Sequence, residues 1–158
     1  MNSFSFSVNG QLTNVDADDS TPLLYVLRDT LQLNSPRYGC GEESCGACCV
    51  LLDDKPVFSC TLPIAAVASR SVTTVEGLSQ GGKRHVLQQA FLEFNAAQCG
   101  YCSSGILMSA SHLLATNPAP TRAEIQAALD AHLCRCGAHN RVIRAILHAA
   151  QRLGGSSA

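Results

Sequence analysis

The stretch YGCGEESCGACCV, residues 38–50, holds four of the chain's nine cysteines and three glycines. Such a density of thiols is typical of a disulfide knot, a zinc site or an iron–sulfur cluster. The cysteine total is odd, and the first residues, MNSFSFSVNGQL, show neither the basic start nor the apolar run of a signal peptide. We therefore expect a cytoplasmic protein with reduced thiols, or one exported with a signal-bearing partner, and this argues against disulfides.

The spacing of the first cysteines favours a cluster over zinc. They read C-x4-C-x2-C, then one more cysteine after eleven intervening residues, which is the plant-type [2Fe–2S] spacing. The cluster is anionic, and the interleaved glycines Gly39, Gly41 and Gly46 let the backbone wrap around it with peptide N–H groups toward sulfur. A structural zinc ion needs no such cradle. The predicted ligands are Cys40, Cys45, Cys48 and Cys60.

A second group of cysteines lies far along the chain, at Cys99, Cys102, Cys134 and Cys136. Its spacing, C-x2-C and later C-x-C, also suits zinc. Cys102 and Cys136, however, stand just before predicted helices, whose N-terminal ends favour an anion. A Rieske centre needs two Cys–His pairs, and only Cys136 has a nearby histidine, His139. We expect a second cluster here, while Cys49 is predicted to be a buried core thiol.

The periodicity of the chain changes near its middle. Phe4, Phe6 and Val8 alternate with serines as in a strand, and Asn9-Gly10 suits a tight hairpin. The first half is therefore predicted as an α+β mixed sheet, with a helix at residues 22–31 and further strands at 49–52, 57–62 and 72–75. After a linker at residues 77–82, four amphipathic segments predict a four-helix bundle: residues 86–94, 106–114, 121–129 and 142–150. Thr121 and Glu124 form a predicted capping box at the start of the third helix, and the C-terminal GGSSA is expected to fray.

Composition excludes several classes of function. A net charge of −1 and a pI near 6.5 give no basic surface for nucleic acid. No apolar run is long enough for a membrane span, and no phosphate-binding glycine motif is present. The charged fraction of 15% fits either a surface covered by a partner or an alanine- and serine-rich composition. The histidines are predicted to be ordinary bundle or interface residues: His85, His112, His132, His139 and His148.

Three segments together resemble a known family. They are CGEESCGAC followed by Cys60, then QCGYCSSGILMSA, then LCRCGAH. This order resembles the small iron–sulfur subunit of the molybdenum hydroxylases, the xanthine oxidase family, from the first strand to Ile146. Within the family, the first two segments look most similar to the small subunits of isoquinoline and nicotinate dehydrogenase-type enzymes.

The resemblance implies two domains. Residues 1–77 would form a β-grasp, plant-type ferredoxin-like domain that holds an outer [2Fe–2S] cluster on the first four predicted ligands. Residues 83–153 would form an all-α four-helix-bundle domain that holds an inner [2Fe–2S] cluster on the second four. In the family, the inner cluster lies beside the molybdopterin cofactor of a large partner subunit. The residues matching Gln98 and Cys136 contact or approach that pterin.

The function implied by the resemblance is electron relay. A molybdopterin centre in the large subunit would hydroxylate an N-heteroaromatic compound or an aldehyde. The two clusters would carry the electrons to an external acceptor such as a cytochrome or a flavin subunit, and this chain alone would turn over no substrate. Two alternatives stay open: a free two-cluster ferredoxin and a zinc-binding structural adaptor.

Two positions depart from the family pattern. Glu43 stands where the first loop, C-G-x-G-x-C, has its second glycine. A positive φ there would cost about 1 kcal/mol, so we expect this loop to be shaped differently. Ser104 replaces the proline of C-x-P-G. We expect this serine to loosen the helix entry slightly while its hydroxyl helps satisfy helix-end groups.

Overall fold

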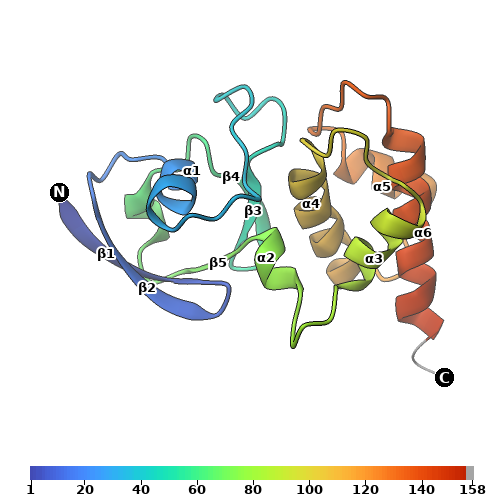
Figure 1. Cartoon of the computed structure of the whole chain (residues 1–158), viewed down its shortest axis with the longest axis horizontal. Helices are drawn as coiled ribbons and strands as arrows, with labels where there is room; N and C mark the ends of the chain where they lie inside the picture. The colour runs from blue at the N-terminus through green and yellow to red at the C-terminus, as the bar shows by residue number, and fades with distance from the viewer. Residues whose placement is uncertain (156–158) are drawn as a thin grey trace.

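A mixed sheet forms the first half of the chain (Figure 1). Within residues 1–155, which the computed structural model describes, the sheet has five strands in the order β2-β1-β5-β3-β4. The β1–β5 pair is parallel, and the other neighbours are antiparallel. The strands are β1 (Asn2–Val8), β2 (Gln11–Ala17), β3 (Cys49–Leu52), β4 (Lys55–Phe58) and β5 (Ser71–Thr73).

The β1–β2 hairpin forms as predicted. Asn9 and Gly10 both have positive φ, +52° and +81°, which a two-residue turn of this twist requires. Phe6 and Val8 alternate into the core. Leu12 on the return strand is 77% exposed, because it pairs with Ser7 on the outer face of the hairpin.

The β3–β4 hairpin turns earlier than the sequence suggests. Asp53 and Asp54 both take positive φ, +48° and +63°, so the turn needs only these two residues. As a result β4 begins at Lys55 and ends at Phe58, instead of spanning residues 57–62. Pro56 is tolerated because β4 is an edge strand.

Short helices cover the sheet and connect it to the second half. The predicted helix at residues 22–31 is α1 (Leu23–Tyr25) followed by a π-helical turn, η1 (Val26–Thr30), and a 3₁₀ turn, η2 (Ile64–Val67), lies later. The predicted strand 72–75 and linker 77–82 are partly wrong, since α2 (Val75–Leu78) follows β5 directly. A Cβ at Gly77 would lie 2.2 Å from Asn9 Oδ1, so this glycine is packed against the first hairpin.

Helices make up the second half: α3 (Val86–Glu93), α4 (Ser103–Thr116), α5 (Arg122–Ala128) and α6 (His139–Gly155). The predicted capping box of Thr121 and Glu124 starts α5, and an unpredicted one, His85 with Gln88, starts α3. The expected fraying of the C-terminal GGSSA is not seen at its two glycines, which belong to α6; its last three residues lie outside the described range.

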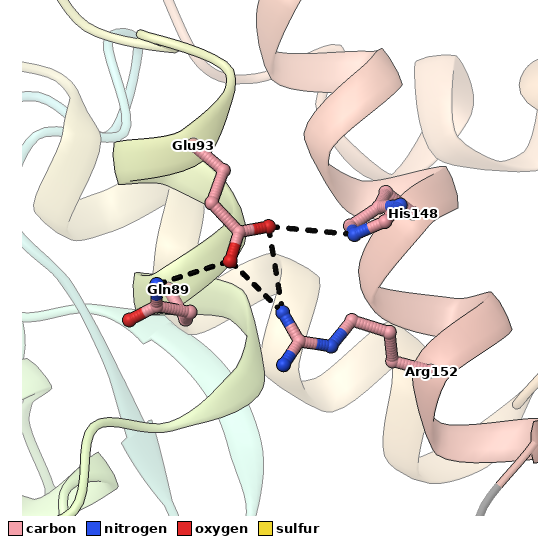
Figure 2. A network of polar contacts seen from close by, with 4 residues as sticks. All are labelled: Gln89, Glu93, His148 and Arg152. Carbon is pink, nitrogen blue, oxygen red and sulfur yellow. Dashed lines mark hydrogen bonds and ion pairs between the residues drawn. The ribbon is translucent and has the colours of Figure 1, made fainter.

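A polar network holds α3 against α6. Glu93 accepts a hydrogen bond from Gln89 and forms ion pairs with His148 and Arg152 (Figure 2). Phe94 packs its ring against that of His148, with 5.1 Å between centroids. These contacts close the side of the helical half that faces away from the sheet.

The two halves have separate cores that meet at one seam. One core lies under the sheet and the other among α3–α6. Figure 1 shows β3 beside α4, and there Met108 packs against Cys49 and Leu51. In the described residues no helix has the length and apolarity needed to cross a lipid bilayer.

Candidate metal centres

The first four predicted ligands come together as two pairs. The backbone N–H of Cys40 points at Cys45 Sγ, 3.4 Å away, and the thiols of these two residues interact. Cys48 and Cys60 contact each other through their thiols and pack with Leu24. Cys48 lies in the turn directly before β3, and the turn after β4 brings Cys60 back to it.

Backbone amides surround the outer sulfurs, as the glycine-rich loop predicts. The N–H groups of Glu42 and Ser44 lie 3.4 and 3.2 Å from Cys40 Sγ. These hydrogen bonds lower the pKa of the Cys40 thiol below its ordinary value. Cys48 differs, because burial raises the pKa of its thiol to about 12. The first pair is thus supported by amides at the surface, and the second lies inside the apolar core.

Glu43 has the left-handed backbone that its place in the motif requires. Its φ is +62°, so the position keeps the left-handed conformation of the glycine it replaces, and the expected change in loop shape is wrong. Its carboxylate accepts a hydrogen bond from the Thr61 hydroxyl, one residue after Cys60. The side chain therefore ties together the two segments that carry the outer ligands.

The second four predicted ligands form two further pairs. Cys136 Sγ lies 3.5 Å from Cys99 Sγ, and the thiols of Cys102 and Cys134 interact. Burial raises the pKa of the Cys102 thiol to about 12. The N–H of Tyr101, followed by the thiol of Cys136, lowers the pKa of Cys99.

Only one of the two predicted helix N-termini lies directly at a cysteine. Cys102 is the N-cap of α4, as expected, but Cys136 lies three residues before α6. The amides of residues 136–138 point at Cys134, where they outweigh burial and lower the pKa of the thiol. The expected role of Ser104 is wrong: its hydroxyl is buried and has no hydrogen-bond partner among the described residues. It lies inside the first turn of α4 with helical neighbours, whereas a capping side chain needs an extended backbone.

The pairing of thiols fits two-iron clusters. Each iron of a [2Fe–2S] cluster takes two of the four thiolates, so a site must offer two pairs set apart rather than four thiols around one point. Both sites present their four thiols as two contacting pairs. Over residues 1–155, no group of three or more histidine, cysteine or acidic side chains surrounds a single ion position, as a tetrahedral zinc site would. All nine cysteines are free.

The two sites face a shared cavity. It has a volume of about 360 Å³, and cysteines from both groups line it together with Leu133 and Arg135. Several hydrogen bonds join the loops at this point, among them one from the Tyr101 hydroxyl to the Tyr38 carbonyl. The N–H of Leu133 donates to the Cys45 carbonyl at 3.1 Å, and Arg37 donates to the Gly100 carbonyl at 2.8 Å.

Comparison with known proteins agrees with this arrangement. A 2Fe-2S iron-sulfur cluster binding domain model matches residues 6–72, and a [2Fe-2S] binding domain model matches residues 74–147. The chain is 48% identical to one of the subunits of nicotinate dehydrogenase from Pseudomonas putida, over 93% of this chain and 94% of that one. It is 43% identical to the alpha subunit of isoquinoline 1-oxidoreductase from Brevundimonas diminuta, over 92% and 96% of the two chains.

The chain belongs to the small iron–sulfur subunits of the xanthine oxidase family. This confirms the family, the α+β-then-helical fold and the two [2Fe–2S] clusters predicted from the sequence. A solved aldehyde oxidoreductase from Desulfovibrio desulfuricans has the same fold, with a TM-score of 0.93 and 39% identity. The match covers 98% of this chain and 17% of that longer one. An electron-transfer role follows from the paired cluster domains.

Gln98 and Cys99 of this iron–sulfur subunit are exposed beside the inner site, and the contact of Gln98 with the pterin stays a prediction. Cys49 and the histidines lie as the sequence suggests, with one exception. Cys49 is buried against Leu51 and Met108, and burial raises its pKa to about 11. His132 is the exception: it lies between the two cysteine loops, and burial lowers its pKa to about 4. Its place two residues before Cys134 is the only sequence signal for this position.

Proposed function

We propose that this chain carries electrons from a molybdopterin centre in a large partner subunit to an external acceptor. The outer cluster would be held by Cys40, Cys45, Cys48 and Cys60, and the inner one by Cys99, Cys102, Cys134 and Cys136. The four close thiol pairs carry this proposal, because they match the two thiolates that each iron takes. The domains would be residues 1–77 and 83–153, joined by the segment between them.

The partner is inferred from the relatives. Two of them are named as subunits, and the aldehyde oxidoreductase carries this fold within a chain about six times as long. A separate large subunit would then supply what the rest of that chain supplies. Gln98 and Cys136 would face its pterin, in keeping with the exposure of Gln98 and Cys99 at the surface. The substrate class would be an N-heteroaromatic compound or an aldehyde.

Each cluster, when bound, supplies one-electron transfer. The residues of the chain prepare for this chemistry in three ways. Amides aimed at Cys40 and Cys134 stabilise negative charge on sulfur. Leu24 and the sheet exclude water from Cys48 and Cys60. The Leu133–Cys45 hydrogen bond joins the two sites directly. A cytoplasmic location suits nine thiols that must stay reduced, and a cytochrome or flavin subunit would be the acceptor.

Substitution of Cys136 tests the proposal. In Cys136→Ser we expect loss of the inner-cluster signal on reduction, retention of the outer one, and weaker co-purification of a molybdenum-containing chain. Cys49→Ser is the matched control, because Cys49 lies outside both groups, and it should keep both signals and the partner. If Cys136→Ser keeps both cluster signals, its assignment as a ligand fails. A wild-type chain that elutes without any large molybdenum protein would indicate a free two-cluster ferredoxin.

A further inference from the structure

The two cysteine loops meet at Gly46, which has no room on either side. A Cβ on Gly46 would lie 2.2 Å from Nδ1 of His132. On the other side, a Cβ on Gly105 of α4 would lie 1.9 Å from the carbonyl oxygen of Gly46. Gly46 stands between Cys45 and the start of β3, so this contact fixes the outer loop against the helical half.

His132 is held in place from several directions. Its side chain is only 3% exposed. Its Nε2 lies 2.7 Å from the hydroxyl of Ser109 on α4, and that hydroxyl lies 3.6 Å from Cys49 Sγ on β3. The His132 carbonyl in turn receives Nε2 of His139 at 3.2 Å. The ring thus connects α4, β3 and the segment that leads to Cys134.

The residue after His132 makes the most direct connection between the two sites. The Leu133 N–H donates to the Cys45 carbonyl, and Leu133 is bonded to Cys134. One hydrogen bond therefore joins a ligand residue of the outer site to the neighbour of a ligand residue of the inner site. Electron tunnelling is faster through covalent and hydrogen bonds than across van der Waals gaps, so its rate depends on this contact.

We propose that His132 is a positioning residue for electron exchange between the two clusters. The ring packs against Gly46 while its Nε2 contacts the Ser109 hydroxyl, and together these contacts hold Leu133 within reach of the Cys45 carbonyl. This role rests on the electron-relay function proposed above. It gives His132 a task beyond filling the core, because the ring acts on the path between the clusters without being a ligand to either.

The test compares four variants in the assembled holoprotein: His132→Ala, His132→Gln, Ser109→Ala and, as a control, His112→Ala. His112 also joins the two halves, through the Asp54 carbonyl at 2.7 Å, but it lies away from the cysteine loops. Two quantities are measured: the magnetic interaction between the two fully reduced clusters, and the rate of electron exchange between them after a one-electron pulse. Iron content and the signals of each cluster are determined on the same samples.

With iron content intact, we expect His132→Ala to slow exchange at least tenfold and to weaken the magnetic interaction. His132→Gln, which keeps a polar group for Ser109, should recover part of the rate, and His112→Ala should equal wild type. A fully loaded His132→Ala protein with unchanged rate and interaction would overturn the proposal. If His132→Ala does not load both clusters, His132→Gln and Ser109→Ala provide the test. Unchanged rates of electron exchange in both of these variants would reject the proposal. A wild-type protein without two clusters would instead reject the proposed function.

Discussion

Gly105 approaches Gly46 so closely that a Cβ added to Gly105 would come within 1.9 Å of the Gly46 carbonyl oxygen. The first residue belongs to the first turn of α4, and the second to the loop of the outer cysteines. Backbone meets backbone here, so neither side can yield by a change of rotamer. The relation between the two halves of the molecule, and with it the distance between the two cysteine sites, depends on this contact.

Gly105→Ala should therefore be strongly destabilising. Overpacking against backbone costs about 1–3 kcal/mol, more than the helix propensity gained from alanine. Gly154→Ala in α6 is the matched control, because a Cβ there meets nothing within 4 Å and alanine should be neutral or stabilising. Thermal unfolding of the two holoproteins, followed by the visible absorbance of the clusters, compares them. Equal midpoints would mean that the contact is not tight.

The Glu43 position combines backbone strain with a useful side chain. Glu43→Ala should keep the strain of the positive φ and lose the bond from Thr61, whereas Glu43→Gly loses the bond but removes the strain. We expect Glu43→Gly to be more stable than Glu43→Ala by about 1 kcal/mol. The rate at which a chelator strips iron from the outer site measures the difference. Thr61→Val should speed iron removal from the outer site and leave iron removal from the inner site unchanged. Identical rates of iron removal from Glu43→Ala and Glu43→Gly would refute this account of the strain.

Glu76 gives the first half a pH dependence of stability. Burial alone would raise its pKa, but hydrogen bonds from Ser35 and Thr74 outweigh burial and lower it. A lowered folded-state pKa favours the folded state above the unfolded value of about 4.3, and the gain is lost as pH falls through the folded value. Because Glu76 is exposed to solvent, which weakens its hydrogen bonds, we expect Glu76→Gln to cost no more than about 1 kcal/mol at pH 7.

Urea unfolding from pH 7 down to about pH 3, below the unfolded pKa, checks the sign of the Glu76 effect. The difference in unfolding free energy between wild type and Glu76→Gln should shrink toward the acid end. Asp130→Asn, at an exposed position after α5, serves as the control and should alter stability little. A difference that stays constant or grows toward low pH would contradict the assignment of the hydrogen bonds to the ionised carboxylate.

Local chemistry predicted from the sequence is largely found in the structure. The Asn9-Gly10 turn and the Thr121–Glu124 capping box are set by neighbouring residues, and both are present. The loop at Glu43, expected to change shape, keeps the left-handed backbone instead. The thiol pairs follow from cysteine spacing once the chain is folded. Prediction is wrong where the chemistry is less usual: two aspartates make the β3–β4 turn without glycine.

Contacts between the halves cannot be read from the sequence. The place of His132 depends on two loops from different domains meeting at Gly46, and no periodicity reports such a meeting. The same holds for α2, where Gly77 looks like part of a flexible linker but is fixed by its approach to Asn9. The Ser104 hydroxyl is expected from the sequence to cap a helix, yet α4 begins at Ser103 and leaves that hydroxyl inside the first turn.

The most direct test of the central claim is an elemental and magnetic analysis of the chain isolated without oxygen. Two [2Fe–2S] clusters require about four iron atoms and about four acid-labile sulfides per chain, and two distinct paramagnetic signals after one-electron reduction of each. We predict a brown protein with this content of iron and sulfide and with both paramagnetic signals. A colourless, magnetically silent protein that contains zinc and neither iron nor sulfide would contradict the account.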